Sequence, residues 1–244
     1  FVNDEPRIKA YTEIAGLSYK EAVSYTMVGC NEPVLPGGIY MGSSQENVAR
    51  CLENTLYKRK DDVIKCVTFD EFYAVFENEL FSDLNEMMRY ADGFNLIRSR
   101  DVNLVSSIFF YGSIENAKSI TQGGADLATN GLDLIGFTTV IDSLTIIKQF
   151  VYDEKRIEMS DLLDALESNW DGHELLRAEI LKRGRFFGNN DELSDGIACR
   201  LTDSVYRCLN GKKNLFGKPY LVGNLIGYNQ HNVWFGNNMR ATPD

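Results

Sequence analysis

The chain has 244 residues and a mass of 27.6 kDa, of which 44% are apolar and 25% are charged. This balance is typical of a folded globular protein and excludes a disordered chain, a collagen and a small disulfide scaffold. The 35 acidic residues outnumber the 25 basic residues, and the resulting net charge of −10 argues against nucleic acid and anionic membrane surfaces as partners.

Targeting signals and metal-binding motifs are absent from the sequence. No window reaches the roughly 18 apolar residues of a membrane span, and the acidic stretch Phe1–Pro6 lacks the pattern of a secretory signal. The five cysteines form no close pairs and there are two histidines, so we predict free thiols and no metal site. We expect a cytoplasmic protein, and we expect the chain to be a piece of a longer one.

In the first half of the chain, the predicted elements lie on either side of Cys30 in the sequence. A short helix is expected over 17–25, because Ser18 and Glu21 have the spacing of a capping box. A strand-like run over 25–28 then ends at Gly29 and Cys30, and a loop rich in turn residues follows over 33–44. Apolar spacing predicts helices over 45–60 and 69–98, the second with a break near Gly93.

The second half is predicted to be mostly helical, which makes the chain a helix-dominated α/β protein without a domain boundary. Ser160 is expected to cap a helix over 161–168, and Asn190 or Asp191 is expected to cap the last long helix. Helices are predicted over 102–121, 142–152, 161–168, 174–182 and 191–209, and strands over 134–139, 220–228 and 233–235.

A calcium loop is excluded although Asp191, Asp195 and Gly196 resemble half of an EF-hand. The third position of that loop would be Leu193 and the twelfth would be Thr202, where calcium needs oxygen ligands and a carboxylate. The same residues are better explained as the start of a helix. Among the thiols, Cys51, Cys199 and Cys208 are predicted to be packing residues on helices.

A thiol and a carboxylate stand two residues apart in Gly29-Cys30-Asn31-Glu32-Pro33. This block, with Asn47-Val48-Ala49-Arg50 after it, resembles the cysteine-loop region of the glycyl radical enzymes, the superfamily that includes pyruvate formate-lyase. Four later blocks resemble the same family in the family's order. They are the run from Tyr111 to the Thr121-Gln122-Gly123-Gly124-Ala125 turn, Gly136–Lys148, Phe187-Gly188-Asn189-Asn190-Asp191, and Ala241-Thr242-Pro243-Asp244.

The resemblance implies the fold and the domain organisation. It implies that residues 1–244 form a single domain, the C-terminal part of a ten-stranded α/β barrel that carries the cysteine loop inside. In this family the radical is stored on a glycine in a C-terminal segment. No such motif occurs here, so a radical-glycine domain is expected beyond residue 244 and the chain alone is expected to be inactive.

The resemblance also implies the chemistry. Cys30 would carry a thiyl radical that abstracts hydrogen from a substrate, and Glu32 would be the general base for a 1,2-elimination. The residue before Cys30 is Gly29 rather than a second cysteine, which disfavours formate-lyase chemistry. A dehydratase or lyase acting on a diol, a hydroxylated amino acid or a choline-like molecule is therefore expected. An aryl-acetate-type radical decarboxylase and a catalytically inactive relative are the alternatives.

Substrate-lining residues and partners follow from the same resemblance. Asn31 stands where the family has an apolar residue, and Ser44 lies in a polar stretch, so both are candidates to line the pocket, although Ser44 could equally be a helix cap. No cofactor is expected to bind this chain. The glycyl radical would be installed in the full-length protein by an activating enzyme that uses S-adenosylmethionine and an iron–sulfur cluster. A small-molecule substrate and that activase are the expected partners, and a homodimer is a further one to test.

Overall fold

The structure is a computed structural model that describes residues 4–13, 16–28 and 32–224. Its residues form two compact units. Within the described ranges, the first unit comprises residues 4–44, 87–133 and 211–224, and the second comprises residues 45–86 and 134–210. In the described ranges, no helix is long and apolar enough to cross a membrane.

The first unit begins with two helices and a hairpin. The helices are α1 (Asp4–Glu13) and α2 (Tyr19–Ala22), and the predicted capping box of Ser18 and Glu21 is present at the start of α2. The hairpin is made of β1 (Thr26–Val28) and β2 (Glu32–Val34), which pair antiparallel. The predicted strand before Gly29 is therefore confirmed.

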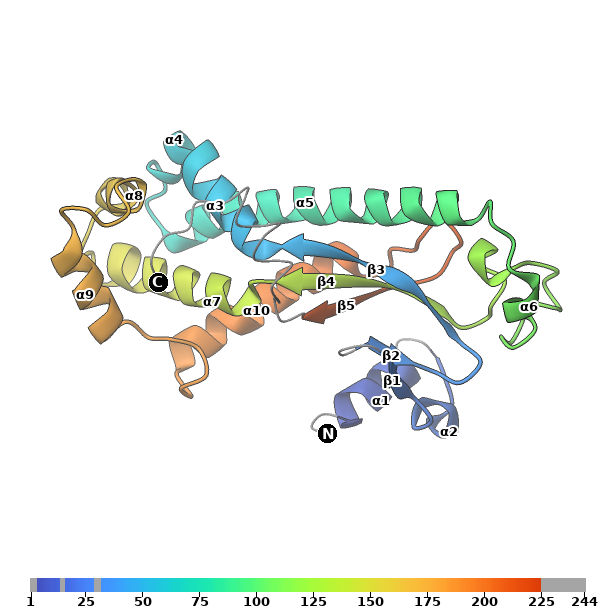
Figure 1. The fold of residues 1–244 in the computed structure, drawn as a ribbon. Coiled ribbons are helices and arrows are strands. Elements are labelled where there is room, and N and C mark those ends of the chain that lie inside the picture. The colour runs from blue at the N-terminus through green and yellow to red at the C-terminus, as the bar shows by residue number, and fades with distance from the viewer. Residues whose placement is uncertain (1–3, 14–15, 29–31, 225–244) are drawn as a thin grey trace. The chain divides into compact units, whose positions relative to one another are not determined.

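A three-stranded sheet follows, in the order β3-β4-β5. Its strands are β3 (Ile39–Asn47), β4 (Ala128–Ile135) and β5 (Tyr220–Asn224), and Figure 1 shows the three arrows pointing the same way, as in a parallel sheet. The predicted loop over 33–44 is wrong, because β2 and most of β3 occupy it. The sequence of β3 is polar and its strand conformation comes from pairing with β4, which outweighs local propensity.

One long helix, α5 (Phe69–Arg98), has the predicted bounds but no break at Gly93. A side chain at Gly93 would meet nothing within 4 Å, so this glycine is simply exposed on a continuous helix. In the first unit, α5 is tied to β3 and β4. Arg98 Nη1 donates to the carbonyl of Met41 at 2.6 Å, and Asn95 bonds Asn130.

The predicted helix over 102–121 is wrong. The chain forms α6 (Leu104–Ser107), turns and the 3-10 helix η1 (Ile120–Gln122). Gly112 has φ 87° and Ala117 has φ 49°, and these left-handed conformations cannot continue a right-handed helix. In addition, Gly112 passes so close to Asp126 that a side chain there would clash with its carboxylate.

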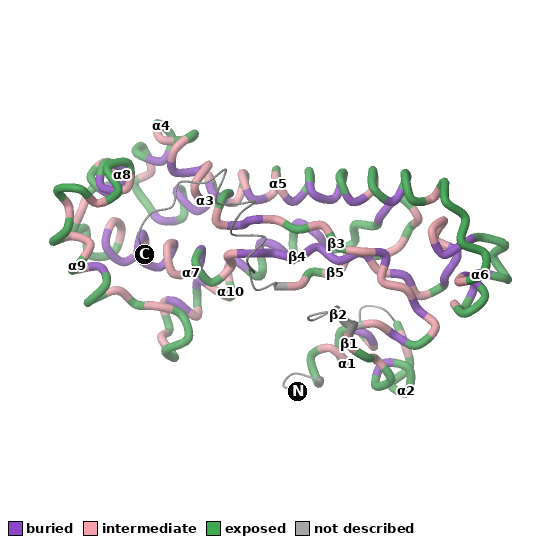
Figure 2. The backbone as a smooth tube through the Cα atoms, in the orientation of Figure 1, coloured by how far each residue is buried: buried purple, intermediate pink, exposed green. Residues whose placement is uncertain are grey.

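The second unit is a helical layer with an aromatic core. Its helices, besides the first part of α5, are α3 (Val48–Lys58), α4 (Lys60–Val63), α7 (Phe137–Ile146), α8 (Met159–Glu167), α9 (Glu174–Arg183) and α10 (Glu192–Leu209). The π-helix η2 (Ile147–Asp153) continues directly from α7. Figure 2 shows buried backbone along the inner sides of α3, α5 and α7.

Most of the predicted helices of this unit are confirmed, with shifted starts. The predicted apolar face of α3 is buried. Residue 136, a glycine with φ 79°, separates β4 from α7, so the strand predicted over 134–139 ends earlier and the helix begins earlier. Helix α8 begins at Met159 with Glu158 as its cap, so the predicted cap at Ser160 is wrong. The strand predicted over 233–235 and the end of the one over 220–228 lie outside the described residues.

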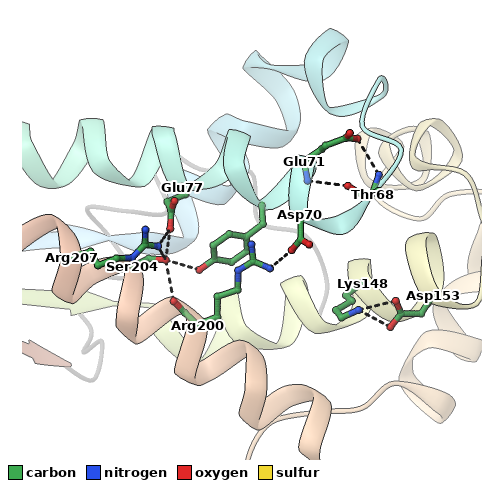
Figure 3. A network of polar contacts seen from close by, with 10 residues as sticks. Thr68, Asp70, Glu71, Glu77, Lys148, Asp153, Arg200, Ser204 and Arg207 are labelled. Atoms are coloured by element: carbon green, nitrogen blue, oxygen red, sulfur yellow. Dashed lines mark hydrogen bonds and ion pairs between the residues drawn. The ribbon is translucent and has the colours of Figure 1, made fainter.

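A network of hydrogen bonds and ion pairs connects α5 to α10 within the second unit, as Figure 3 shows. The buried hydroxyl of Ser204 lies 3.0 Å from the Tyr73 hydroxyl and donates to Glu77 at 2.5 Å. Arg200 stacks 3.8 Å from the centre of the Tyr73 ring and donates to Asp70 at 2.6 Å. These contacts satisfy the polar atoms at the rim of the aromatic core, which is a structural role.

Candidate functional site

The predicted radical cysteine stands between β1 and β2 in the sequence. The strands pair Thr26 with Val34, Met27 with Pro33 and Val28 with Glu32, so the last pair encloses three residues. Cys30 is the middle one of these three in the sequence. Cys30 and Asn31 lie outside the described residues, and Glu32 is described only as the first backbone position of β2. The roles predicted for these three residues stay predictions.

The base of this hairpin is anchored in a small core. Tyr11, Ala22 and Leu35 are buried there, and the half-buried Tyr25 packs against them with its ring 6.2 Å from the ring of Tyr11. Burial raises the pKa of the Tyr11 hydroxyl above its ordinary value. The residues on either side of the hairpin, Tyr25 and Leu35, are therefore held by the same cluster of side chains.

Ser44 lies in β3 and not at a helix start. The helix cap after it is Asn47, so the helix-cap explanation of Ser44 is wrong. Ser44 and Ser43 line a groove of about 500 Å³ in the first unit, together with Tyr90 and Phe94 of α5 and with Asn130 of β4. Aromatic and small polar side chains such as these are typical of sites that bind small molecules. The predicted contact of Ser44 with substrate stays a prediction.

Three buried asparagines lie beside this groove, and sequence reasoning missed them. The side-chain carbonyl of Asn130 accepts from the amide of Asn95 at 2.9 Å and from that of Asn214 at 2.5 Å. The carbonyl of Asn214 in turn accepts from the backbone of Phe216 and Lys218. No local pattern could have found the cluster, because its members come from three distant parts of the sequence.

One group of metal-ligating side chains occurs in the described part of the chain. A carboxylate oxygen of Glu46, the Cys51 sulfur and a carboxylate oxygen of Asp83 lie within 4.8 Å of one another. The thiol of Cys51 donates to Asp83 Oδ2 at 3.1 Å, and burial followed by the charge of Asp83 raises its pKa well above the ordinary value. A protonated thiol is a poor metal ligand, so the internal hydrogen bond accounts for this group.

The other thiols divide between the core and the surface. Cys51 and Cys208 are buried, as predicted for packing residues. Cys199 is exposed, so its predicted packing role is wrong. It lies on α10, whose buried face is formed by other residues, among them Ile197 and Leu201.

Comparison with known proteins places the chain in a family. A family model described as pyruvate formate lyase-like matches residues 1–236. The (2S)-3-sulfopropanediol dehydratase of Klebsiella oxytoca is 28% identical over 266 residues, which cover 99% of this chain and 31% of the relative. An isethionate sulfite-lyase of Oleidesulfovibrio alaskensis is 30% identical over 230 residues, which cover 81% of this chain and 26% of the relative.

A solved structure supports the same conclusion. The hydroxyproline dehydratase from Clostridioides difficile superposes with a TM-score of 0.89 at 25% identity, over 99% of this chain and 32% of that one. The chain thus spans about a third of the length of the relatives it matches. The predicted fold class, an α/β fold that forms part of the glycyl radical enzyme barrel, is confirmed. The resemblance to this family is likewise confirmed, and the chain belongs to the pyruvate formate lyase-like glycyl radical enzymes.

Proposed function

We propose that the protein is a glycyl radical lyase that eliminates a leaving group next to a hydroxyl-bearing carbon of a small molecule. Diols, hydroxylated amino acids and choline-like molecules are the substrate class. The observation that carries this proposal is that β1 and β2 pair on either side of the sequence segment that contains Cys30, with Glu32 as the first residue of β2, in a chain whose relatives are dehydratases and sulfite-lyases.

In the proposed reaction, the Cys30 thiyl takes a hydrogen atom from the hydroxyl-bearing carbon, forming the S–H bond and leaving the unpaired electron on carbon. Glu32 accepts the hydroxyl proton, and the neighbouring leaving group departs with its bonding electron pair. A carboxylate shielded from water is suited to this step, because burial raises its pKa and makes it a stronger base. Return of the hydrogen atom from Cys30 to the product radical regenerates the thiyl.

The radical itself requires groups outside this chain. We propose that it is stored on a glycine of the parent protein and installed by an activating enzyme that uses S-adenosylmethionine. The contribution of this chain is the cysteine hairpin and the surfaces around it. A position out of contact with water would protect the reactive sulfur from side reactions.

The test uses the complete protein with its activase under anaerobic conditions. Cys30→Ser should abolish turnover of a panel of vicinal diols, hydroxyproline and choline, while the glycyl radical signal in electron paramagnetic resonance persists. The physical reason is that the serine O–H bond is too strong to take part in the relay. Undiminished turnover in Cys30→Ser would overturn the thiyl role.

Glu32→Gln tests the base separately. The amide cannot accept the hydroxyl proton, so turnover should fall on the order of 10²–10⁴-fold with the fold and the radical intact. Full activity in Glu32→Gln would leave the radical role of Cys30 standing, remove the base, and favour a decarboxylase over an eliminating enzyme.

A further inference from the structure

The strands β1 and β2, which flank Cys30 in the sequence, are too short to fix their own orientation. Each strand contributes three residues to the ladder, and isolated two-stranded hairpins are marginally stable in water. The small core around Tyr11 and Leu35 fixes the base of this hairpin. The direction of the strands beyond that base depends on side chains that pack along them.

Arg7 of α1 makes such contacts. Its guanidinium Nη1 lies 3.0 Å from the sulfur of Met27, and its guanidinium carbon lies 6.0 Å from the centre of the Tyr25 ring. Positions 25 and 27 are two apart on an extended run, so their side chains point to the same side. One planar cation thus contacts Tyr25, the residue just before β1, and Met27 within β1, which stands three residues before Cys30 in the sequence.

Helix α1 presents Arg7 together with a second contact to the same strand. Arg7 and Tyr11 are four residues apart and therefore lie on one face of the helix. Both reach Tyr25, Arg7 through its cation and Tyr11 through its ring. The neighbouring Lys9 lies on another face, where its ammonium is exposed and 4.0 Å from Glu13.

We infer that Arg7 is a positioning residue for the cysteine hairpin, acting through Tyr25 and Met27 to fix the direction of β1. This inference rests on the proposed role of Cys30. Radical transfer needs its donor and acceptor atoms at close, fixed separation, so a loosened hairpin lowers the rate of the chemical step without weakening substrate binding.

The first test measures amide hydrogen exchange in the complete protein. Arg7→Met keeps an unbranched aliphatic side chain without the guanidinium, and exchange in β1 and β2 should become about five-fold faster. The exchange rate of Arg7→Lys should lie between the rates of Arg7→Met and of the unsubstituted protein. An ammonium can still lie over Tyr25, but it lacks the planar guanidinium that reaches both Tyr25 and Met27. Lys9→Met is the matched control, and its hairpin amides should exchange as fast as those of the unsubstituted protein. The amides of α10 serve as the internal reference.

Unchanged hairpin exchange in Arg7→Met would overturn the inference. If Arg7→Met also accelerates exchange in α10, that variant has lost its global fold, and the result for Arg7→Lys is used instead. Faster exchange of the hairpin amides in Arg7→Lys, with α10 still protected, supports the role of Arg7. Unchanged exchange of the hairpin amides in Arg7→Lys contradicts it.

The second test uses the complete activated protein and the substrate found with the panel. Arg7→Met should lower kcat about ten-fold, with KM and the glycyl radical signal unchanged. If the proposed function itself is wrong, the result is different, because the Cys30→Ser variant would then turn over substrate normally. An inactive Cys30→Ser beside a fully active Arg7→Met would overturn the role of Arg7 alone.

Discussion

Glu46 stands at a position that disfavours its ionised form. It is half-buried near the end of β3, close to Asp83 and Glu86 of α5. Burial, and then the negative charge of Asp83, raise its pKa to about 7, although the backbone N–H of Asn47 and the cation of Arg50 act in the opposite direction. Its ordinary value is 4.5, so the folded state holds this proton more tightly than the unfolded state.

This difference makes stability depend on pH. Below about 4.5 the carboxyl is protonated in both states, and between about 4.5 and 7 the unfolded state ionises first, so stability falls as pH rises. We expect Glu46→Gln, which imitates the protonated form, to raise Tm by about 2–4 °C at pH 8 and to change it by less than about 1 °C at pH 4. Thermal unfolding followed by circular dichroism measures this.

The control for Glu46→Gln is Asp203→Asn, which removes an exposed acid from α10 in the same unit. This variant should show no gain at either pH. An equal gain in both variants would mean that net charge alone, and not the surroundings of Glu46, sets the pH dependence.

At the scale of an element, the start of α10 is held by one side chain with two tasks. Asp191 accepts through Oδ1 from the backbone N–H groups of Leu193 and Ser194, and through Oδ2 from the guanidinium of Arg185 at 2.7 Å. The hydrogen bond from Arg185 is the main reason that the pKa of Asp191 is lowered. Its stabilising effect is therefore present above its ordinary pKa of 3.8 and is lost as pH falls through the lowered value.

Two substitutions separate these tasks. Asp191→Ala removes the cap and the ion pair, and Tm should fall by about 3–6 °C at pH 7. Asp191→Asn keeps a good capping side chain and loses the charge together with the hydrogen bond from Arg185, so it should lose less than half as much. An equal loss in both variants would assign the stabilisation to the pair with Arg185, and scanning calorimetry decides between the two.

The elements that could be predicted are those whose signals are local. The capping box at Ser18 is a spacing pattern within four residues and was predicted, and Asp191 is one of the two residues expected to cap α10. Strand β3 was missed, because its polar sequence becomes a strand only by pairing with β4. The helix expected over 102–121 was wrong, because the left-handed conformation of Ala117 has no sequence signal.

The same division applies to the candidate site. Cys30 and Glu32 could be proposed as catalytic residues because they are close in sequence and belong to a block that resembles the family. The three asparagines beside the groove and the contact between Arg7 and β1 could not, because their partners meet only through the tertiary fold. Burial also changed the expected behaviour of Glu46, which no spacing rule could have indicated.

For the molecule as a whole, exposed apolar surface is concentrated in one stretch. Eleven large apolar side chains are exposed between residues 90 and 114, all in the first unit, among them Phe94 and Ile97 of α5. Figure 2 shows the exposed backbone around α6. Exposed patches of this kind lower solubility, whereas they contribute little to the stability of the fold.

Replacing two of these side chains tests this statement. Phe94 is 61% exposed, so Phe94→Ser combined with Ile97→Ser should shift Tm by about 2 °C or less, while binding of an apolar fluorescent dye decreases and solubility rises. Phe76, on the same helix, is 0% exposed, and Phe76→Ala should cost about 3–5 kcal/mol of unfolding free energy. A loss of stability in the double variant comparable to that in Phe76→Ala would show that residues 94 and 97 pack in the core.

The π-helical turn after α7 constrains how this chain can change in length. A π-helix closes hydrogen bonds from residue i to i+5, so it accommodates one residue more than an α-helical turn of the same height. Within it, the buried Gln149 donates to Glu154 at 2.8 Å and accepts from the backbone of Arg185 at 3.2 Å. Deleting one residue from this turn would let it return to α-helical hydrogen bonding, so the side chains that follow keep their directions. A single-residue deletion should therefore be tolerated better here than in the middle of α10, where it turns every following side chain of the helix by about 100°.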